Sequence, residues 1–470
     1  MKWACFLHFY QPPTQTEEIL NKVTDEAYRR IFKELENAPD AHLTLNVTSC
    51  LLDLWSEYGL AEMIDRLGGL LESGQVELTS SAKYHPVLPK LPPEEIRRQI
   101  ELDLETHQKY FGDLYKPKGF FPPESAYNRY LAEIVSEYDF QWVLAEEISY
   151  QGGFGQVKYD RVYKIKDIPL HIFFRERKSS FKILSGQLGT VDLFEDYFSS
   201  KISKDEYLLT AMDGETFGHH RPGMEKLLFE IFNSSQTETV LVSDLLDLFS
   251  QEEEMETVPS TWALMEKDLE RNAPFSRWDD PDNEIHQMQW ELTDLAIEAV
   301  RNSQFKISSN KLNENLKIEN SVQKKWLGAR RLLDRALHSD QYWWASARPW
   351  WSLEMIERGA HELKEVVEHL PDVSPEKEEK AQNLYAQIIF TGFEWQRSGK
   401  VTELSRKEDE EVRERTDQGL PQLPDEEVDK MINNLREEMK EVAGREEFER
   451  AAQLRDRIKE LEEYKREDSS

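Results

Sequence analysis

The chain has 470 residues, of which 39% are hydrophobic and 12 are tryptophan, which is enough for two or three domains with large cores. Its net charge of −32 repels phosphate backbones and anionic lipids, so we expect neither nucleic-acid nor membrane binding. The apolar run at the start is too short for a secretion signal, and no stretch of about 20 apolar residues could span a membrane. Cys5 and Cys50 are the only cysteines, which favours a reduced cytoplasmic protein without a disulfide framework or a cysteine-ligated metal.

The first half of the chain alternates short apolar runs with segments that have helical spacing. Pro93 opens one such segment, in which Ile96, Ile100 and Leu104 share a face. This alternation is typical of α/β proteins with a parallel (β/α) barrel or an open sheet, and we assign it to residues 1–250. The expected strands are 3–7, 43–47, 75–79, 119–121, 142–145, 170–174 and 207–212, with a candidate eighth at 239–242.

From about residue 250 the spacing changes to long amphipathic helices, which predicts a helical domain over 251–397 that contributes to the active-site cleft. Residues 398–425 are polar, charged and marked by prolines, and we predict a linker there.

The tail from 426 to 466 has the spacing of two short helices with apolar faces, separated by Gly444. The first face carries Ile432, Leu435, Met439 and Val442, and the second carries Phe448, Ala451, Ala452, Leu454, Ile458 and Leu461. A hairpin this small cannot bury both faces alone, so it favours docking or dimerisation over a solvated charged tail.

Ionisable residues follow several of the expected strands. In (β/α) barrels the chemistry lies at the carboxyl ends of the strands, and here those ends carry His8, Glu77, Glu124, Glu146, Glu147 and Asp213. Pro122 and Pro123 fix the backbone before Glu124, and Gly214 permits a tight turn after Asp213.

Two carboxylates from different strands of one barrel indicate glycoside hydrolysis, which needs one ionised and one protonated carboxyl group beside the bond that breaks. The alternative is a metal site built from His8, Asp213, His219 and His220, as in a metal-dependent deacetylase. Adjacent histidines tend to point in different directions, whereas metal-binding pairs on helices are spaced about four residues apart. We therefore favour the carboxylate pair and expect no metal and no other cofactor.

Five segments together resemble the five ordered motifs of glycoside hydrolase family 57. They are HFYQPP (8–13), GQVEL (74–78), GFFPPESAY (119–127), AMDGETFGHHRPGME (211–225) and ALHSDQYWW (336–344). The resemblance covers residues 1 to about 395 and implies a seven-stranded (β/α) barrel followed by a helical domain. The family contains α-amylases, 4-α-glucanotransferases, amylopullulanases and glucan branching enzymes.

By this resemblance Glu124 is the nucleophile and Asp213 the general acid/base of a retaining mechanism. Substrate contacts would come from His8, Glu77, His220, Asp340 and the aromatic wall of Trp343. The sequence departs from the family at Tyr10, where many members have a second histidine, and at Phe121, where a tryptophan is frequent. These departures leave open the preferred glucan length and the balance of hydrolysis against transfer.

The tail resembles a UVR motif, the helical hairpin of bacterial excision-repair subunits B and C, on the run FERAAQLRDRIKELE (448–462). In those proteins it mediates protein–protein contact, which here implies a protein partner or self-association through 426–466 and no role in repair. Since the candidate catalytic residues all precede the tail, we expect it to be dispensable for chemistry.

The sequence thus predicts a retaining enzyme of the α-amylase or 4-α-glucanotransferase type, with an α-glucan or maltooligosaccharide as substrate. The alternatives are a glucan branching enzyme and a carbohydrate-sensing regulator that recruits partners through its tail.

Overall fold

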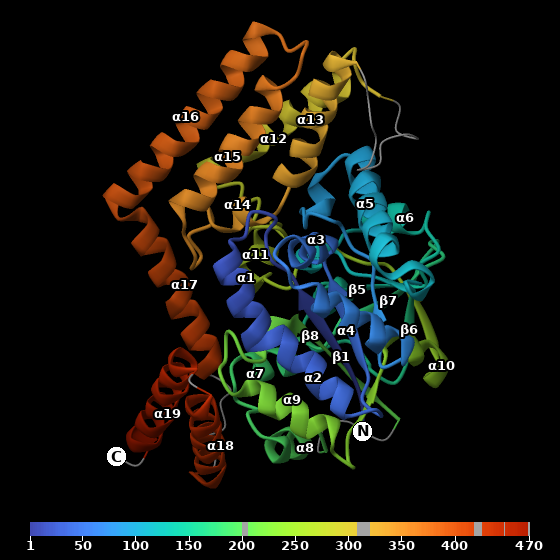
Figure 1. The fold of residues 1–470 in the computed structure, drawn as a ribbon, viewed down its shortest axis with the longest axis vertical. Helices are drawn as coiled ribbons and strands as arrows, with labels where there is room; N and C mark the ends of the chain where they lie inside the picture. The colour runs from blue at the N-terminus through green and yellow to red at the C-terminus, as the bar shows by residue number, and fades with distance from the viewer. Residues whose placement is uncertain (200–204, 308–319, 418–424, 446, 469–470) are drawn as a thin grey trace.

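In this computed structural model the described residues are 1–199, 205–307, 320–417, 425–445 and 447–468, and they form an α/β region followed by helices (Figure 1). The first of two five-stranded sheets has the order β3-β2-β1-β8, with β9 also paired to β1. Its strands are β1 (Lys2–Phe9), β2 (Leu43–Val47), β3 (Val76–Leu78), β8 (Tyr207–Asp213) and β9 (Glu238–Val240). All of its pairs are parallel, as expected for strands joined by helical crossovers.

The second sheet has the order β10-β6-β7-β5-β4 and contains one antiparallel pair, β6 with β7. Its strands are β4 (Gly119–Phe120), β5 (Trp142–Glu146), β6 (Val162–Ile165), β7 (His171–Arg175) and β10 (Glu252–Met255). The sequence did not predict β6 or β10, and β10 falls in the range that we assigned to the helical domain.

The two sheets contact each other at two places, between the segment after β3 and β4 and between the segment after β7 and β8. The Ser80 N–H donates to the Gly119 carbonyl at 3.0 Å, and the Glu176 N–H donates to the Leu209 carbonyl at 2.8 Å. Buried apolar side chains, among them Phe6, Phe121 and Phe173, form one cluster drawn from both sheets. The structure therefore has α/β sheets in place of one continuous ring of strands, and the closed seven-stranded barrel stays a prediction.

Helices cover the outer faces of the sheets. In residues 1–250 they are α1 (Glu17–Val23), α2 (Arg29–Asn37), α3 (Ser49–Glu57), α4 (Ala61–Glu72), α5 (Pro93–Phe111), α6 (Arg129–Val135), α7 (Arg177–Leu184), α8 (Val191–Ser199), α9 (Met224–Phe232) and α10 (Leu245–Leu248), with the π-helical turn η1 (Thr24–Tyr28) between α1 and α2. A core that includes Phe32, Leu45 and Trp55 joins the first sheet to its helices.

The helical region lies over the carboxyl ends of the strands (Figure 1). Its helices are α11 (Glu266–Glu270), α12 (Glu284–Asn302), α13 (Ser321–Ala336), α14 (Asp340–Trp343), α15 (Leu353–Glu368) and α16 (Pro375–Ser398). Val143 of β5, Trp290 of α12 and Tyr342 of α14 belong to one buried cluster, so the second sheet and the helices share a core. This shared core sets residues 336–344 above the sheet edge.

Helix α17 (Lys400–Asp417) occupies most of the range in which we predicted a linker, 398–425. Its Glu408 is buried and pairs with Lys267 at 3.1 Å, with Arg348 at 3.3 Å and with Arg277. Three cations on one buried carboxylate tie the helix to the rest of the molecule.

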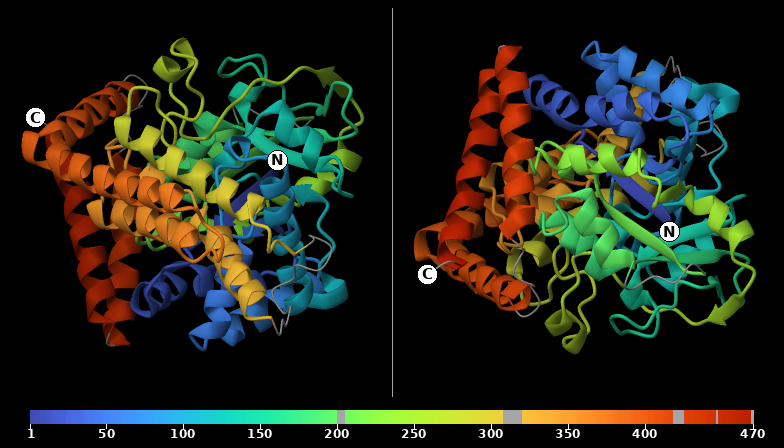
Figure 2. Two further views of the ribbon diagram at one scale, coloured as in Figure 1. Left: turned by 90° about the horizontal axis from the view of Figure 1, so that it is seen from above. Right: turned by 90° about the horizontal axis from the view of Figure 1, so that it is seen from below.

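Helices α18 (Asp425–Gly444) and α19 (Phe448–Asp468) form a hairpin with its own apolar cluster, which includes Met431, Leu435 and Leu454. The hairpin lies beside α2 and α9 in the views of Figures 1 and 2, and Lys226 of α9 donates to Asn434 at 2.9 Å. Among the helices of the described residues, none combines the length and the apolar character that crossing a membrane requires.

Candidate active site

The segment after β4 holds Glu124 in an uncommon backbone conformation. Pro122 and Pro123 precede it, and Glu124 and Ser125 have φ of 59° and 49°, in the left-handed region. A non-glycine residue held there costs on the order of 1 kcal/mol, and such conformations cluster at functional sites. The two prolines fix φ at their own positions and so restrict the backbone before Glu124, which gives the carboxylate a defined direction.

Both oxygens of the Glu124 carboxylate accept hydrogen bonds from segments far away in the sequence. The Trp262 indole Nε1–H donates to Oε2 at 2.9 Å, and the Ser339 hydroxyl donates to Oε1 at 3.3 Å. His85 Nδ1 lies 3.8 Å from Oε1. Residues from both the β10–α11 connection and the helical region therefore complete the surroundings of Glu124.

His8 ends β1 in register with Asp213 at the end of β8. Its Nε2 lies 3.0 Å from Nε2 of His85, and its Nδ1 lies 2.8 Å from Oδ1 of Asn46. Burial lowers the pKa of His8 to about 4 and lowers that of His85 well below its usual range. Both rings are neutral near pH 7, so one can donate and the other accept between them.

Asp340 begins α14 and accepts a hydrogen bond from the Tyr10 hydroxyl and another from His338 Nδ1 at 3.0 Å. Burial acts to raise the pKa of Asp340, but the hydrogen bonds from His338 and Tyr10 lower it below its usual value. Asp340 is thus an ionised carboxylate fixed at the mouth of the strand ends.

Asp213 lies beside a second carboxylate, Glu215. Glu215 accepts hydrogen bonds from Gln11 and from the Tyr28 hydroxyl, each at 2.5 Å, and its Oε2 lies 3.3 Å from His220 Nε2. Burial acts to raise the pKa of Glu215, but the hydrogen bond from His220 and those contacts lower it overall. Burial, and then the charge of Glu215, raise the pKa of Asp213 to about 6.

Glu124 and Asp213 interact electrically. Burial, and then the charge of Asp213, raise the pKa of Glu124 to about 8, against hydrogen bonds from Trp262 and Ser339 that lower it. Between about pH 6 and pH 8 the two carboxyl groups therefore hold a single proton. The higher pKa belongs to Glu124, so this proton lies on Glu124 when no substrate is present.

Glu77 lies apart from this group. Its carboxylate accepts hydrogen bonds from the Thr44 hydroxyl at 2.7 Å and from the Ser243 N–H at 3.0 Å, and burial raises its pKa. In the strand register Glu77 of β3 is paired with Thr44 of β2. Thr44 lies two residues before Asn46, which is paired with His8 of β1. It therefore lies one layer of side chains below the strand ends.

Trp343 lies in the helical region, whereas His219 and His220 lie in the turn after β8. Trp343 is half-buried and its ring packs against Trp278, with centroids 5.4 Å apart. The His220 side chain is 50% exposed beside Glu215, so it is open to a ligand. His219 Nδ1 lies 2.6 Å from Oε2 of Glu26, which belongs to η1.

The alternative metal site would need His8, Asp213, His219 and His220 to converge. The three histidines instead take separate partners, which are His85, Glu26 and Glu215 respectively. Within the described residues, no three His, Cys, Asp or Glu side chains are arranged to hold one metal ion.

Residues 5–259, more than half of the chain, match the family model of glycosyl hydrolase family 57. The protein belongs to this family. Residues 429–464 match the UvrB/uvrC motif.

An α-amylase of Pyrococcus horikoshii is 25% identical over 229 residues, which are 48% of this chain and 35% of that protein. Alpha-amylase 1 of Dictyoglomus thermophilum is 23% identical over 258 residues, which are 52% of this chain and 36% of that protein. The chain thus spans about a third of the length of these curated relatives.

Solved structures show the same fold. The 4-α-glucanotransferase of Thermococcus litoralis superposes with a TM-score of 0.59 at 18% identity, over 79% of this chain and 60% of that chain. A branching enzyme of Thermococcus kodakaraensis superposes with a TM-score of 0.61 at 16% identity, over 83% of this chain and 96% of that chain.

The two departures from the family 57 motifs have different surroundings. Tyr10 stacks on His85 with ring centroids 3.8 Å apart and donates to Asp340, so it joins two parts of the site. Phe121 packs between Phe6 and Trp262 in the apolar cluster below Glu124.

Three neighbours of the predicted pair in this family 57 site were not predicted from the sequence. Glu215 and Ser339 lie within two of the quoted motifs, so their positions in those motifs could have indicated them. Trp262 lies outside every motif, and nothing local in the sequence links it to Glu124, which is 138 residues earlier.

Proposed function

We propose that Glu124 and Asp213 are the catalytic pair of a retaining enzyme that acts on α-1,4-linked glucans. The observation that supports this most is that both oxygens of Glu124 accept hydrogen bonds, from Trp262 and from Ser339, while the charge of Asp213, from another strand, acts on the same carboxyl group. Glu124 attacks the anomeric carbon while Asp213 gives its proton to the leaving oxygen. Asp213, now ionised, then removes a proton from water or from a sugar hydroxyl, which releases the glycosyl group from Glu124.

This mechanism requires the shared proton to move from Glu124 to Asp213 when substrate binds. Trp262 and Ser339 both donate to Glu124, and such donors favour its ionised form. A bound sugar displaces water, which strengthens both hydrogen bonds and places the leaving oxygen as an acceptor for Asp213.

We assign sugar contacts to the ionised Asp340, to neutral His8 and to exposed His220. A carboxylate accepts from sugar hydroxyls, and an indole face packs on the apolar face of a pyranose ring, which is the role of Trp343. Glu77 lies below this layer, so its contribution is to support the strand ends through Thr44 and Ser243.

Backbone hydrogen bonds join the two sheets after β3 and after β7, and on this basis we infer a seven-stranded barrel as the framework of the site. The buried free thiols of Cys5 and Cys50 support a reducing, cytoplasmic location.

The test is incubation of the protein with purified maltooligosaccharides followed by chromatographic sizing of the products. Shorter chains alone identify a hydrolase, and a ladder of longer and shorter chains identifies a 4-α-glucanotransferase. New α-1,6 links identify a branching enzyme, the activity named for the T. kodakaraensis structural neighbour. Binding of the oligosaccharides without any turnover would overturn the catalytic assignment and leave a glucan-sensing protein.

A further inference from the structure

The C-terminal hairpin contacts the segment that follows Asp213. Arg450 of α19 donates from one guanidinium nitrogen to the Gly218 carbonyl, and from the other to Glu225 Oε1 at 2.5 Å and to Glu438 Oε1 at 3.4 Å. The Arg450 side chain is only 4% exposed. A buried guanidinium whose donors are used in this way fixes the groups that it contacts.

Gly218 is the point at which this contact reaches the turn between β8 and α9. Its φ is 126°, and a side chain there would come within 2.0 Å of the Glu26 carbonyl. The Gly218 backbone therefore lies clamped between η1 on one side and Arg450 of the hairpin on the other. The next residue, His219, contacts the Glu26 carboxylate at 2.6 Å.

From Gly218 the contact continues to the carboxylate beside Asp213. The N–H groups of His219 and His220 donate to the Glu215 carbonyl at 3.1 and 2.8 Å, and the His220 ring lies on the Glu215 carboxylate. The turn thus sets the position of Glu215, the charge of which acts on Asp213.

The hairpin is seated on the α/β region by shape as well as by charge. A side chain at Gly189 would lie 2.4 Å from Met431 Cε, and one at Gly223 would lie 2.3 Å from Leu435 Cδ2. Two glycines therefore leave the space that α18 fills. Lys430 of α18 also pairs with Asp192 of α8 at 2.8 Å.

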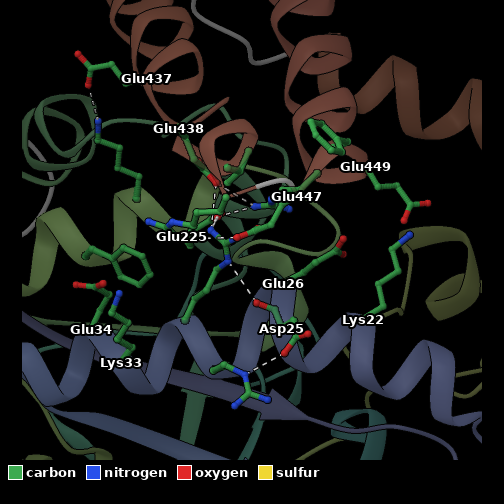
Figure 3. Close-up of a pocket in the computed structure, with 18 of the residues that line it drawn as sticks. Lys22, Asp25, Glu26, Lys33, Glu34, Glu225, Glu437, Glu438, Glu447 and Glu449 are labelled. Carbon is green, nitrogen blue, oxygen red and sulfur yellow. Dashed lines mark hydrogen bonds and ion pairs between the residues drawn. The ribbon is translucent and has the colours of Figure 1, made fainter. Parts of the chain in front are cut away.

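Beside these contacts the hairpin and the N-terminal helices border an open cavity of about 1130 Å³ (Figure 3). Asp25, Glu26 and Glu34 line it from η1 and α2, and Glu438 and Glu447 line it from the hairpin. Arg30 of α2 reaches across to Glu438 at 3.3 Å and to Glu447 at 3.4 Å. Ion pairs thus span the interface around Arg450.

We propose that Arg450 is a positioning residue, through which the C-terminal hairpin holds the Gly218 carbonyl and keeps the His219–His220 turn and Glu215 in place beside Asp213. The effect on turnover rests on the proposed function, whereas the effect on the turn does not. The hairpin is then part of the working enzyme, which differs from our expectation that the tail is dispensable. A partner or self-association through the hairpin stays a separate prediction.

The test compares R450A with R455A in the full-length protein. Arg455 lies on the same helix, pairs with the adjacent Asp456 and is 56% exposed, so R455A is the matched control. The first readout is the pKa of His220, followed by NMR of ring-labelled histidine and assigned with H220Q. Burial acts to lower the pKa of His220, and the charge of Arg221 has a smaller effect in the same direction. The hydrogen bond to Glu215 and the charges of Glu215 and Asp213 outweigh both and raise this pKa overall.

If Arg450 holds the turn, R450A lowers the His220 pKa by about half a unit or more, and R455A leaves it unchanged. The kcat on maltooligosaccharides falls about tenfold in R450A with a smaller change in KM, because the reacting groups and not the outer binding sites are displaced. R450K keeps the positive charge near Glu225, but a lysine cannot donate to Glu225 and to the Gly218 carbonyl from two separate nitrogens, so we expect an intermediate effect. R450K also serves as the test if R450A does not fold.

An unchanged His220 pKa in folded R450A, or in R450K if only that variant folds, overturns the proposal whatever the activity. A lowered His220 pKa with wild-type kcat overturns the link to turnover. If the wild type itself acts on no glucan, the proposed function fails, and the titration alone decides whether the hairpin holds the turn.

Discussion

The fold shifts the pKa of two glutamates in opposite directions: half-buried Glu124 at the strand ends and buried Glu408 in α17. Around Glu124 the neighbours are an indole, a hydroxyl, neutral His85 and the carboxylate of Asp213, and burial raises its pKa to about 8. Burial also acts to raise the pKa of Glu408, but the charges of Arg277, Arg348 and Lys267 lower this pKa below its usual value.

The difference shows what each region is built for. A buried carboxyl group without a cation retains its affinity for a proton, which suits a site that must move protons. A buried carboxylate among three cations stays ionised and ties distant segments together, at the risk that loss of one partner leaves the others uncompensated. Arg450 and Glu225 in the hairpin interface likewise form a buried ion pair that ties distant segments together.

The largest expected effect comes from E124Q, which removes only the attacking charge. We expect kcat to fall by about 10³-fold or more, with the folded state retained in circular dichroism melting. E133Q, on the exposed face of α6, is the control and should turn over as the wild type does. Activity of E124Q within about tenfold of wild type would rule out Glu124 as the nucleophile.

E408A should separate stability from chemistry. Removing the carboxylate takes away the anion that Lys267, Arg277 and Arg348 share, and the two arginines are buried. We therefore expect a loss of about 3 kcal/mol in the free energy of unfolding, measured by urea denaturation. E403A on the same helix removes an exposed i,i+4 pair and should leave the stability nearly unchanged. Equal stabilities of E408A and E403A would show that α17 is not anchored by this cluster.

W262F tests the neutral surroundings of Glu124. The indole hydrogen bond lowers the pKa of Glu124, so its loss raises that pKa further and disfavours the ionised nucleophile. We expect kcat/KM to fall about tenfold and the alkaline limb of its pH profile, which follows the higher pKa of the pair, to move to higher pH. A profile identical to that of the wild type would mean that this hydrogen bond does not act on the nucleophile.

The pH dependence of the wild type should be bell-shaped, with a maximum between about pH 6 and 8. Below this range both carboxyl groups are protonated and no nucleophile remains, whereas above it both are ionised and no acid remains. Outside the range kcat/KM should fall about tenfold per pH unit. A flat profile from pH 5 to 9 would contradict a pair that shares one proton.

The smallest expected effect is that of a chelator. Because the proposed chemistry uses carboxyl groups, prolonged treatment with EDTA should leave kcat and KM unchanged. Loss of activity that zinc or another divalent ion restores would instead support a metal site at His8, Asp213, His219 and His220.

The sequence alone determined most of the elements, and it singled out Glu124 and Asp213, because both depend on local signals. Alternating apolar runs marked β1, β2, β3, β4, β5, β7 and β8, and Pro93 marked the start of α5. Two prolines before Glu124 and a glycine after Asp213 indicated rigid turns at strand ends. Helical spacing interrupted at Gly444 indicated the hairpin.

Only the tertiary structure decided which distant groups surround those carboxylates. Trp262 and Ser339 reach Glu124 across 138 and 215 residues of chain, and Arg450 reaches Gly218 across 232. The polar composition of residues 398–425 is typical of a linker. The local sequence does not show that Glu408 is ion-paired, because its cationic partners are residues 267, 277 and 348. Local propensity and periodicity specify an element and its buried face, but a contact between segments this far apart depends on how all the intervening elements pack.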